Sequence, residues 1–328
     1  MIKSIVKLIL ALSISALPVV TPAQQNPVRI GIAGLSHDHI HGLLGRKEKG
    51  DIVIVGIAEP DSGLVERLAK RYGFDKKIVY SSIDEMLRST KPEAVMAYND
   101  IFGHLEVVEK CAPRGIHVMV EKPLAVSVAH ADKMAKLAKK NNIQILTNYE
   151  TTWYGSNTEA YKVVNEEEQI GEILKIEFHT GHQGPVEIGC SKEFLAWLTD
   201  PVLNGAGALN DFGCYGANLS TWLMKGETPV SVTAVTHTNK PQVYPNVDDE
   251  ASIIVQYPYN QVIIQASWNW PYNRKEMKIY GQSGYVFCRD TENMTVFKSK
   301  EKKATDKAAP ALNEDRNDAF SYFARVVR

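Results

Sequence analysis

The most constraining feature of this sequence is a regular alternation of short β-branched runs and longer amphipathic stretches between residues 27 and 148. The runs have the length of buried strands, and the stretches between them carry apolar residues at helical spacing. This alternation predicts an α/β fold in which a doubly wound parallel sheet has helices on both faces. The expected strands are Val28–Ala33, Ile52–Ala58, Ala94–Ala97, His117–Val120 and Gln144–Thr147. The expected helices are Ser62–Tyr72, Ile83–Ser89, Leu105–Gly115 and Ser127–Asn141.

The pattern changes after residue 148. Closely spaced strand-like segments predict an α+β domain over residues 149–328 with an open, mostly antiparallel sheet. The expected helices are Thr158–Glu168 and Leu209–Met224, and the expected strands are Ser231–His237, Ala251–Tyr257, Val262–Trp270, Glu276–Tyr280 and Tyr285–Phe287. The aromatic side chains of Trp268, Trp270 and Tyr272, in and just after one strand, favour a homo-oligomer that covers this sheet. The Lys-rich stretch Lys298–Lys307 is expected to be a solvated loop.

Length and charge narrow the function classes. A chain of 328 residues exceeds the size at which one hydrophobic core usually stops growing, which favours two domains. The formal net charge is −1, so no basic face is implied and a nucleic-acid partner is not expected.

Residues 1–23 have the composition of a signal peptide. Lys3 and Lys7 precede the short apolar run Leu8–Leu17, and small residues at Thr21–Ala23 offer a cleavage site. The apolar run is too short to span a bilayer as a helix, so no stable membrane anchor is expected. The pattern predicts export by the general secretory route to the periplasm or the extracellular space. At the other end, an amphipathic pattern that begins near Asp315 reaches Arg328 without a stop signal, which favours a truncated chain.

The first expected strand leads into a turn that partly matches a dinucleotide-binding fingerprint. Such a fingerprint needs three glycines, for a tight turn, for close approach of the pyrophosphate and for helix packing. Only Gly34 is in register, while Ser36 and His39 occupy the second and third glycine positions. By itself the turn is a weak signal for cofactor binding.

Glu59 ends the second expected strand. An acid at this point can bind the ribose hydroxyls of a dinucleotide and would repel a 2′-phosphate, so the residue favours NAD over NADP. The alternative is that Glu59 caps the helix that begins near Ser62.

Two further motifs carry titratable groups. Pro123 ends the fifth expected strand directly after Glu121 and Lys122, which puts the lysine in the crevice where ligands of such sheets bind. A lysine in a partly dry cleft can have a lowered pKa and transfer protons, although a surface lysine before a turn is the alternative. Asp211 and Tyr215 are four residues apart on the expected helix and share one face, where they could hold a substrate hydroxyl and relay its proton. An ordinary helix start is the alternative for this segment.

Together these residues resemble the glucose–fructose oxidoreductase/inositol dehydrogenase/MocA family over nearly all of residues 27–328. The resemblance rests on Glu121-Lys122-Pro123 and on the segment from Gly207 to Tyr215, with Asn99 and His104 matching the family's loop after strand four. It implies a Rossmann-type N-terminal domain that binds NAD and a catalytic set of Lys122, Asp211 and Tyr215. Most members have histidine where this chain has Tyr215, but the glucose–fructose oxidoreductase and dihydrodiol dehydrogenase branches share the tyrosine. The implied cofactor-binding residues are Gly34, Leu35, Ser36, His37, His39, Glu59, Asn99, His104, Glu121 and Lys122.

We therefore expect an exported NAD-dependent oxidoreductase that transfers a hydride between nicotinamide and a hydroxyl-bearing carbon of a sugar, glycoside or polyol. In this mechanism Tyr215 takes the hydroxyl proton, Lys122 favours its phenolate, and Asp211 orients the pair. No metal ion is expected. Because soluble nicotinamide is scarce outside the cytoplasm, three interpretations stay open: a tightly bound, internally recycled NAD, a glycosidase that uses transient oxidation, and a non-catalytic carbohydrate- or nucleotide-binding relative.

Overall fold

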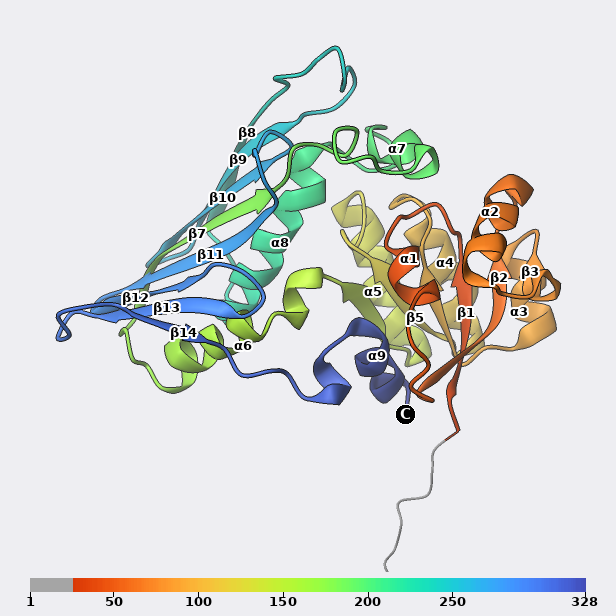
Figure 1. The fold of residues 1–328 in the computed structure, drawn as a ribbon, viewed down its shortest axis with the longest axis horizontal. Helices are drawn as coiled ribbons and strands as arrows, with labels where there is room; N and C mark the ends of the chain where they lie inside the picture. Colours follow the sequence, from red (N-terminus) through yellow and green to blue (C-terminus); the bar gives the residue numbers. More distant parts are fainter. Residues whose placement is uncertain (1–25) are drawn as a thin grey trace, which may run out of the picture.

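The computed structural model describes residues 26–328 and contains two β-sheets side by side (Figure 1). The expected signal peptide lies outside the described residues. Within the described residues, no helix combines the length and the apolar composition that crossing a membrane requires.

The first sheet has six parallel strands in the order β3-β2-β1-β4-β5-β6, as expected for a doubly wound fold. The strands are β1 (Val28–Ala33), β2 (Ile52–Ala58), β3 (Val79–Tyr80), β4 (Ala94–Ala97), β5 (His117–Glu121) and β6 (Ile145–Asn148). From β1 the chain proceeds outward through β2 to β3, and it then returns to the other side of β1 to form β4. The switch point therefore lies between β1 and β4. This switch point is where a ligand crevice forms beyond the carboxyl ends of the strands.

Helices connect these strands and bury their apolar faces against the sheet. They are α1 (Ile40–Leu44), α2 (Ser62–Tyr72), α3 (Ile83–Thr90), α4 (His104–Cys111) and α5 (Val128–Asn141), with the short 3-10 turns η1 (Lys76–Ile78) and η2 (Ala112–Arg114). Asp61 caps α2, because its side chain accepts a hydrogen bond from the backbone N–H of Leu64. The suggestion that Glu59 caps this helix is therefore wrong.

The second sheet has eight strands in the order β14-β13-β12-β11-β7-β10-β9-β8. It is mostly antiparallel, as expected, although β7 and β10 pair in parallel. Its strands are β7 (Ile173–Gly181), β8 (Ser231–His237), β9 (Glu250–Gln256), β10 (Gln261–Ser267), β11 (Arg274–Gly281), β12 (Gly284–Cys288), β13 (Asn293–Lys298) and β14 (Thr305–Ala308). The expected Lys-rich loop is wrong in part, because β14 begins at Thr305 and pairs with β13.

One face of this sheet is covered by helices (Figure 1). The covering segments are α6 (Gly155–Tyr161), the π-helical turn η4 (Lys162–Glu166) and α8 (Ala208–Leu223). The 3-10 turn η3 (Glu150–Trp153) leads from β6 into α6, and α7 (Lys192–Leu198) extends beyond the sheet toward the first half of the molecule (Figure 1). Helix α8 lies close to the sheet because Gly213 and Gly216 face it: a Cβ at Gly216 would lie 2.7 Å from Ile264 Cγ1. The expected helix over Thr158–Glu168 is present but begins three residues earlier, at Gly155.

The chain ends by returning to the first sheet. After η5 (Glu314–Arg316), helix α9 (Ala319–Val327) buries Ala319 and Phe323 in the same cluster as Ile30 and Ile57 of β1 and β2. The last element of the sequence therefore belongs to the core of the N-terminal sheet.

Candidate active site

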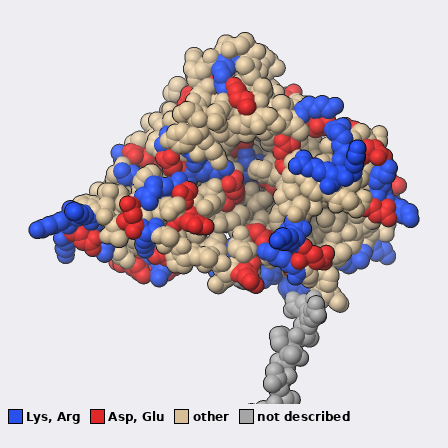
Figure 2. Space-filling view, viewed as in Figure 1, with Lys and Arg blue, Asp and Glu red and all other residues tan. Residues whose placement is uncertain are grey.

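A cavity of about 370 Å³ lies between the carboxyl ends of the first sheet and the beginning of α8. Acidic and basic side chains gather around the hollow between the two halves of the molecule (Figure 2). The lining includes Lys122 at the end of β5, and Asp211 and Tyr215 on α8. The three residues expected to be catalytic therefore come from two halves of the molecule to one cavity.

Lys122 and Asp211 form a buried ion pair, with each side chain 5% exposed. The Lys122 ammonium donates to the Asp211 carboxylate and also to the Asp211 carbonyl oxygen at 3.1 Å. Trp268 Nε1 donates to the other carboxylate oxygen at 2.8 Å, so both oxygens have partners. Trp268 is fully buried, which shows that this tryptophan belongs to the site and not to the open face of the sheet.

The ion pair sets the charge of both partners. Burial by itself would lower the pKa of Lys122, but the neighbouring Asp211 carboxylate raises it above the ordinary lysine value. Burial would raise the pKa of Asp211, and the Lys122 ammonium outweighs it and lowers that pKa. The expectation of a lysine with a lowered pKa is therefore wrong, and Lys122 acts as a fixed cation.

Tyr215 lies one helical turn after Asp211 and is 1% exposed. Lys122 Nζ is 5.4 Å from the centroid of its ring. Burial, followed by the charge of Glu150, raises the pKa of Tyr215 well above the ordinary tyrosine value. The resting side chain is thus a phenol, contrary to the expectation that Lys122 favours its phenolate.

Further cavity residues were not expected from the sequence, among them His182, Glu150 and Lys275. His182 follows β7, and burial lowers its pKa to about 4, so its imidazole is neutral near pH 7. Glu150 and Lys275 form an ion pair of 2.7 Å. No local motif marks these residues, because they meet only when β7, β11 and η3 come together.

The turn after β1 depends on one glycine. Gly34 has φ +81°, and a Cβ there would lie 2.8–2.9 Å from atoms of Asn99. The Leu35 N–H donates to Glu59 at 2.8 Å, and the Asp61 N–H donates to the other carboxylate oxygen at 2.9 Å. Burial raises the pKa of Glu59. The carboxylate is thus fixed beside the turn, after the end of β2, which is the position from which Glu59 was predicted to bind ribose.

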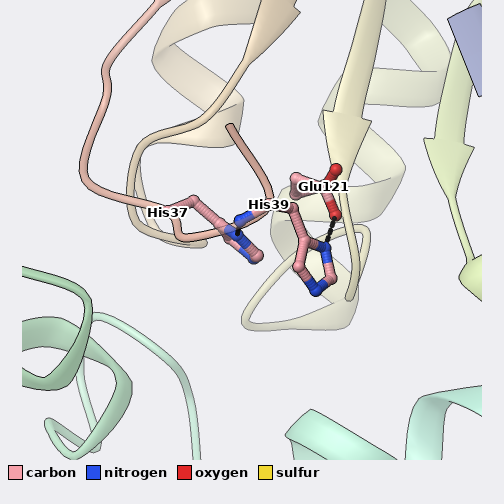
Figure 3. Close-up of side chains that lie close together, drawn as sticks. All are labelled: His37, His39 and Glu121. Carbon is pink, nitrogen blue, oxygen red and sulfur yellow. Dashed lines mark hydrogen bonds and ion pairs between the residues drawn. The ribbon is translucent and has the colours of Figure 1, made fainter. Parts of the chain in front are cut away.

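His37, His39 and Glu121 form a compact cluster next to this turn (Figure 3). Their potential ligand atoms lie within 4.8 Å of one another. His39 Nδ1 is 2.8 Å from one oxygen of Glu121, and Asn148 donates to the other at 2.7 Å. The backbone N–H of His39 donates to His37 Nδ1 at 3.2 Å. This carboxylate therefore has two hydrogen-bond partners without a metal ion, and the pairing directs the His39 imidazole toward the cavity, which it lines.

Several buried polar atoms around this cluster have no hydrogen-bond partner. They are His37 Nε2, Tyr98 Oη, Asn99 Oδ1 and His104 Nε2. Buried polar groups are normally satisfied, so unpaired ones at the end of a parallel sheet indicate a ligand or bound water. His104 Nδ1 is 3.2 Å from the Leu124 carbonyl oxygen, which leaves Nε2 as an acceptor. The Gly34 turn, Glu59 and these unpaired atoms fit a dinucleotide along this edge, although Ser36 and His39 replace two glycines of the usual cradle.

Comparisons with known families agree with this geometry. Residues 28–149 match a family model described as an oxidoreductase family with an NAD-binding Rossmann fold. Residues 159–287 match the model of the GFO/IDH/MocA C-terminal domain.

Individual relatives are distant but cover most of the chain. A trans-1,2-dihydrobenzene-1,2-diol dehydrogenase of Xenopus laevis is 24% identical over 284 residues, which cover 85% of this chain and 81% of that protein. The structure of an inositol dehydrogenase homolog from Azotobacter vinelandii complexed with NAD+ superposes with a TM-score of 0.79 at 17% identity, over 92% of this chain and 85% of that chain. The structure of an aldose-aldose oxidoreductase from Caulobacter crescentus complexed with glycerol superposes with a TM-score of 0.75 at 21% identity, over 92% of this chain and 88% of that chain. The two structural likenesses show a shared fold.

Proposed function

Because this chain belongs to the GFO/IDH/MocA family of oxidoreductases, with an NAD-binding Rossmann fold, we propose that it transfers a hydride between NAD and a hydroxyl-bearing carbon of a sugar, glycoside or polyol. The observation that carries the proposal is the convergence of Lys122, Asp211 and Tyr215 on one cavity between the two sheets. An oxidoreductase acting on CH–OH groups needs a proton carrier and a fixed positive charge at the reacting oxygen, and this set supplies both.

When bound, NAD supplies the hydride acceptor or donor. The Lys122 ammonium donates a hydrogen bond to the reacting oxygen and stabilises the negative charge that develops there. Asp211 holds the ammonium in place and is held in turn by Trp268. Tyr215 carries the proton. In the reducing direction its phenol gives a proton to the carbonyl oxygen, and the phenolate that remains regains a proton from solvent. In the oxidising direction the phenol first loses its proton to solvent, and the phenolate then accepts the proton of the hydroxyl.

At the cofactor end, we assign the turn from Gly34 to His39, together with Glu59, Asn99, His104 and Glu121, to NAD binding. The buried carboxylate of Glu59 supports a preference for NAD over NADP, because a 2′-phosphate beside it would meet a like charge. His39 is hydrogen-bonded to Glu121 and also lines the cavity, which supports a position of its imidazole between cofactor and substrate.

Identifying small molecules released from the purified full-length protein by mass spectrometry tests the proposal. We expect NAD among the released molecules. We also expect turnover of neutral polyols, measured as an increase in NADH absorbance. Absence of bound nucleotide, together with no NAD binding at millimolar concentration, would instead support a non-catalytic carbohydrate-binding relative. Net cleavage of a glycoside without accumulation of NADH would support the glycosidase that uses transient oxidation.

We also propose that the protein is exported, on the composition of residues 1–23 alone. Tight retention of NAD would then serve an enzyme that works away from the soluble nicotinamide pool. Sequencing the N-terminus of the mature protein from fractionated cells of its source tests this proposal: cleavage near Ala23 is expected, and an intact Met1 in the cytoplasmic fraction would contradict it.

A further inference from the structure

A second ion pair lies in the same cavity as Lys122 and Asp211. Lys275 comes from β11 and Glu150 from η3, and their charged atoms are 2.7 Å apart. The Lys275 side chain is 12% exposed and the Glu150 side chain 44% exposed, so the pair faces the open side of the cavity. Tyr154 donates to the second oxygen of Glu150 at 2.7 Å, which fixes the carboxylate.

The ammonium groups of both ion pairs lie close to the proton carrier, Tyr215. Lys122 Nζ is 5.4 Å and Lys275 Nζ is 5.7 Å from the centroid of the Tyr215 ring. A substrate hydroxyl that reaches Tyr215 and Lys122 therefore shares one cavity with Lys275 and Glu150, which puts this second pair within reach of a neighbouring hydroxyl. An ammonium that donates and a carboxylate that accepts are together suited to a hydroxyl group, which does both.

The charge of the cavity limits the substrate further. Lys122 and Lys275 are outnumbered by the carboxylates Asp38, Glu150 and Asp211, which leaves a formal charge of −1. His182 adds no positive charge near pH 7 because burial lowers its pKa to about 4. No unpaired cation among these groups is available for a carboxylate or phosphate on the substrate, and burying such an anion here would be costly.

We propose that Lys275 and Glu150 bind the hydroxyl adjacent to the reacting one, so that the substrate is an uncharged vicinal diol such as a sugar ring or a cyclic polyol. This inference rests on the proposed hydride transfer and deepens it. It assigns substrate recognition to a pair of residues outside both sequence motifs.

A purely structural role for the pair is the alternative, since it also ties β11 to η3. A structural role would change stability and would affect all substrates alike. A recognition role depends on the second hydroxyl. Probes with and without that hydroxyl therefore separate the two.

The test uses the NAD-loaded full chain and compares trans-1,2-cyclohexanediol with cyclohexanol, and methyl β-D-glucopyranoside with D-glucuronate. A hydrogen bond to a charged group contributes about 1.5–3 kcal/mol, so the wild type should favour the diol over cyclohexanol by about 10- to 100-fold in kcat/KM. Lys275→Met should remove most of this preference by raising KM for the diol far more than KM for cyclohexanol. Glu150→Gln keeps the size of the side chain and should also reduce the preference for the diol over cyclohexanol. It serves as the test if Lys275→Met folds poorly.

Lys133→Met is the matched control, because it breaks the exposed ion pair of Lys133 with Glu109 on the other half of the molecule. It should leave both rates unchanged. Equal loss of both probes in Lys275→Met and Glu150→Gln, or a wild type that prefers glucuronate or does not distinguish diol from cyclohexanol, would overturn the inference while hydride transfer stands. No NAD reduction with any neutral diol would overturn the proposed function and this inference together.

Discussion

Glu59 is a buried carboxylate that stabilises the fold and that we propose also binds the cofactor. Its two oxygens accept the N–H groups of Leu35 and Asp61, so the side chain joins the turn after β1 to the end of β2. Glu59 and Lys122 could be predicted because they follow expected strands, and Tyr215 because it lies one helical turn after Asp211 on an expected helix. Glu150 and Lys275 could not, because their contact depends on how η3 and β11 pack.

Replacing Glu59 tests its role at the cofactor. Glu59→Ser removes the negative charge that a 2′-phosphate would meet, so the ratio of the Kd values for NADP and NAD should fall by about tenfold or more. Isothermal titration of the apoprotein with each nucleotide measures this ratio. A matched change, Glu66→Ser in the middle of α2, removes an exposed carboxylate and should leave the ratio unchanged. Tighter binding of NADP than NAD by the wild type would contradict our interpretation of Glu59.

At the scale of elements, the helix that carries Asp211 and Tyr215 depends on its glycines. Gly213 and Gly216 allow α8 to lie against β9 and β10, which sets the depth at which Asp211 and Tyr215 enter the cavity. The regular periodicity of α8 made the helix predictable from the sequence, whereas β7 and α7 were missed. In β7 the charged Lys175 and Glu177 alternate with the buried Ile176 and Phe178, so the sequence did carry a strand signal there, whereas α7 is only seven residues long and too short for a clear helical period.

A Gly216→Ala variant tests this packing. Its Cβ would lie 2.7–2.9 Å from three atoms of the fully buried Ile264, so the free energy of unfolding should fall by about 1–3 kcal/mol. Gly42→Ala is the matched control, since Gly42 lies within α1 and its Cβ would meet nothing within 4 Å. Alanine there should be neutral or stabilise by up to about 1 kcal/mol. Urea unfolding measures both, and equal stability of the two variants would show that α8 has room to move.

On the scale of the whole molecule, the eight-stranded sheet has one covered and one open face (Figure 1). Alternate residues of β9 show this directly: Ile253 and Val255 are buried under α8, while Ile254 is 42% exposed. Ile254 lies directly opposite Ile263 of the neighbouring strand β10. The doubly wound topology of the first half could be predicted from local alternation. The return of α9 to that half could not, because it depends on contacts between the two ends of the chain.

The open face predicts a homodimer in which two such sheets cover each other. Light scattering during gel filtration at micromolar concentration should give twice the mass of the chain. Ile254→Asp puts a charge in the centre of the proposed contact and should shift the protein to monomer, whereas Val128→Asp, at an exposed position on α5, should not. A wild type that is monomeric at this concentration would contradict the dimer.

In the proposed mechanism, Lys122, Asp211 and Tyr215 act as one unit across the two halves of the molecule. The most direct test is kcat at saturating substrate for Lys122→Ala, Tyr215→Phe and the double variant, with NAD binding measured on each to show that the fold and the cofactor site persist. Tyr215→Phe should lower kcat by about 10²–10⁴, because it removes the proton carrier and little volume. Lys122→Ala should remove most turnover, and the double variant should lose far less than the product of the two single losses, since residues that act as a unit are not additive. Full activity in either single variant, with NAD bound, would contradict the mechanism.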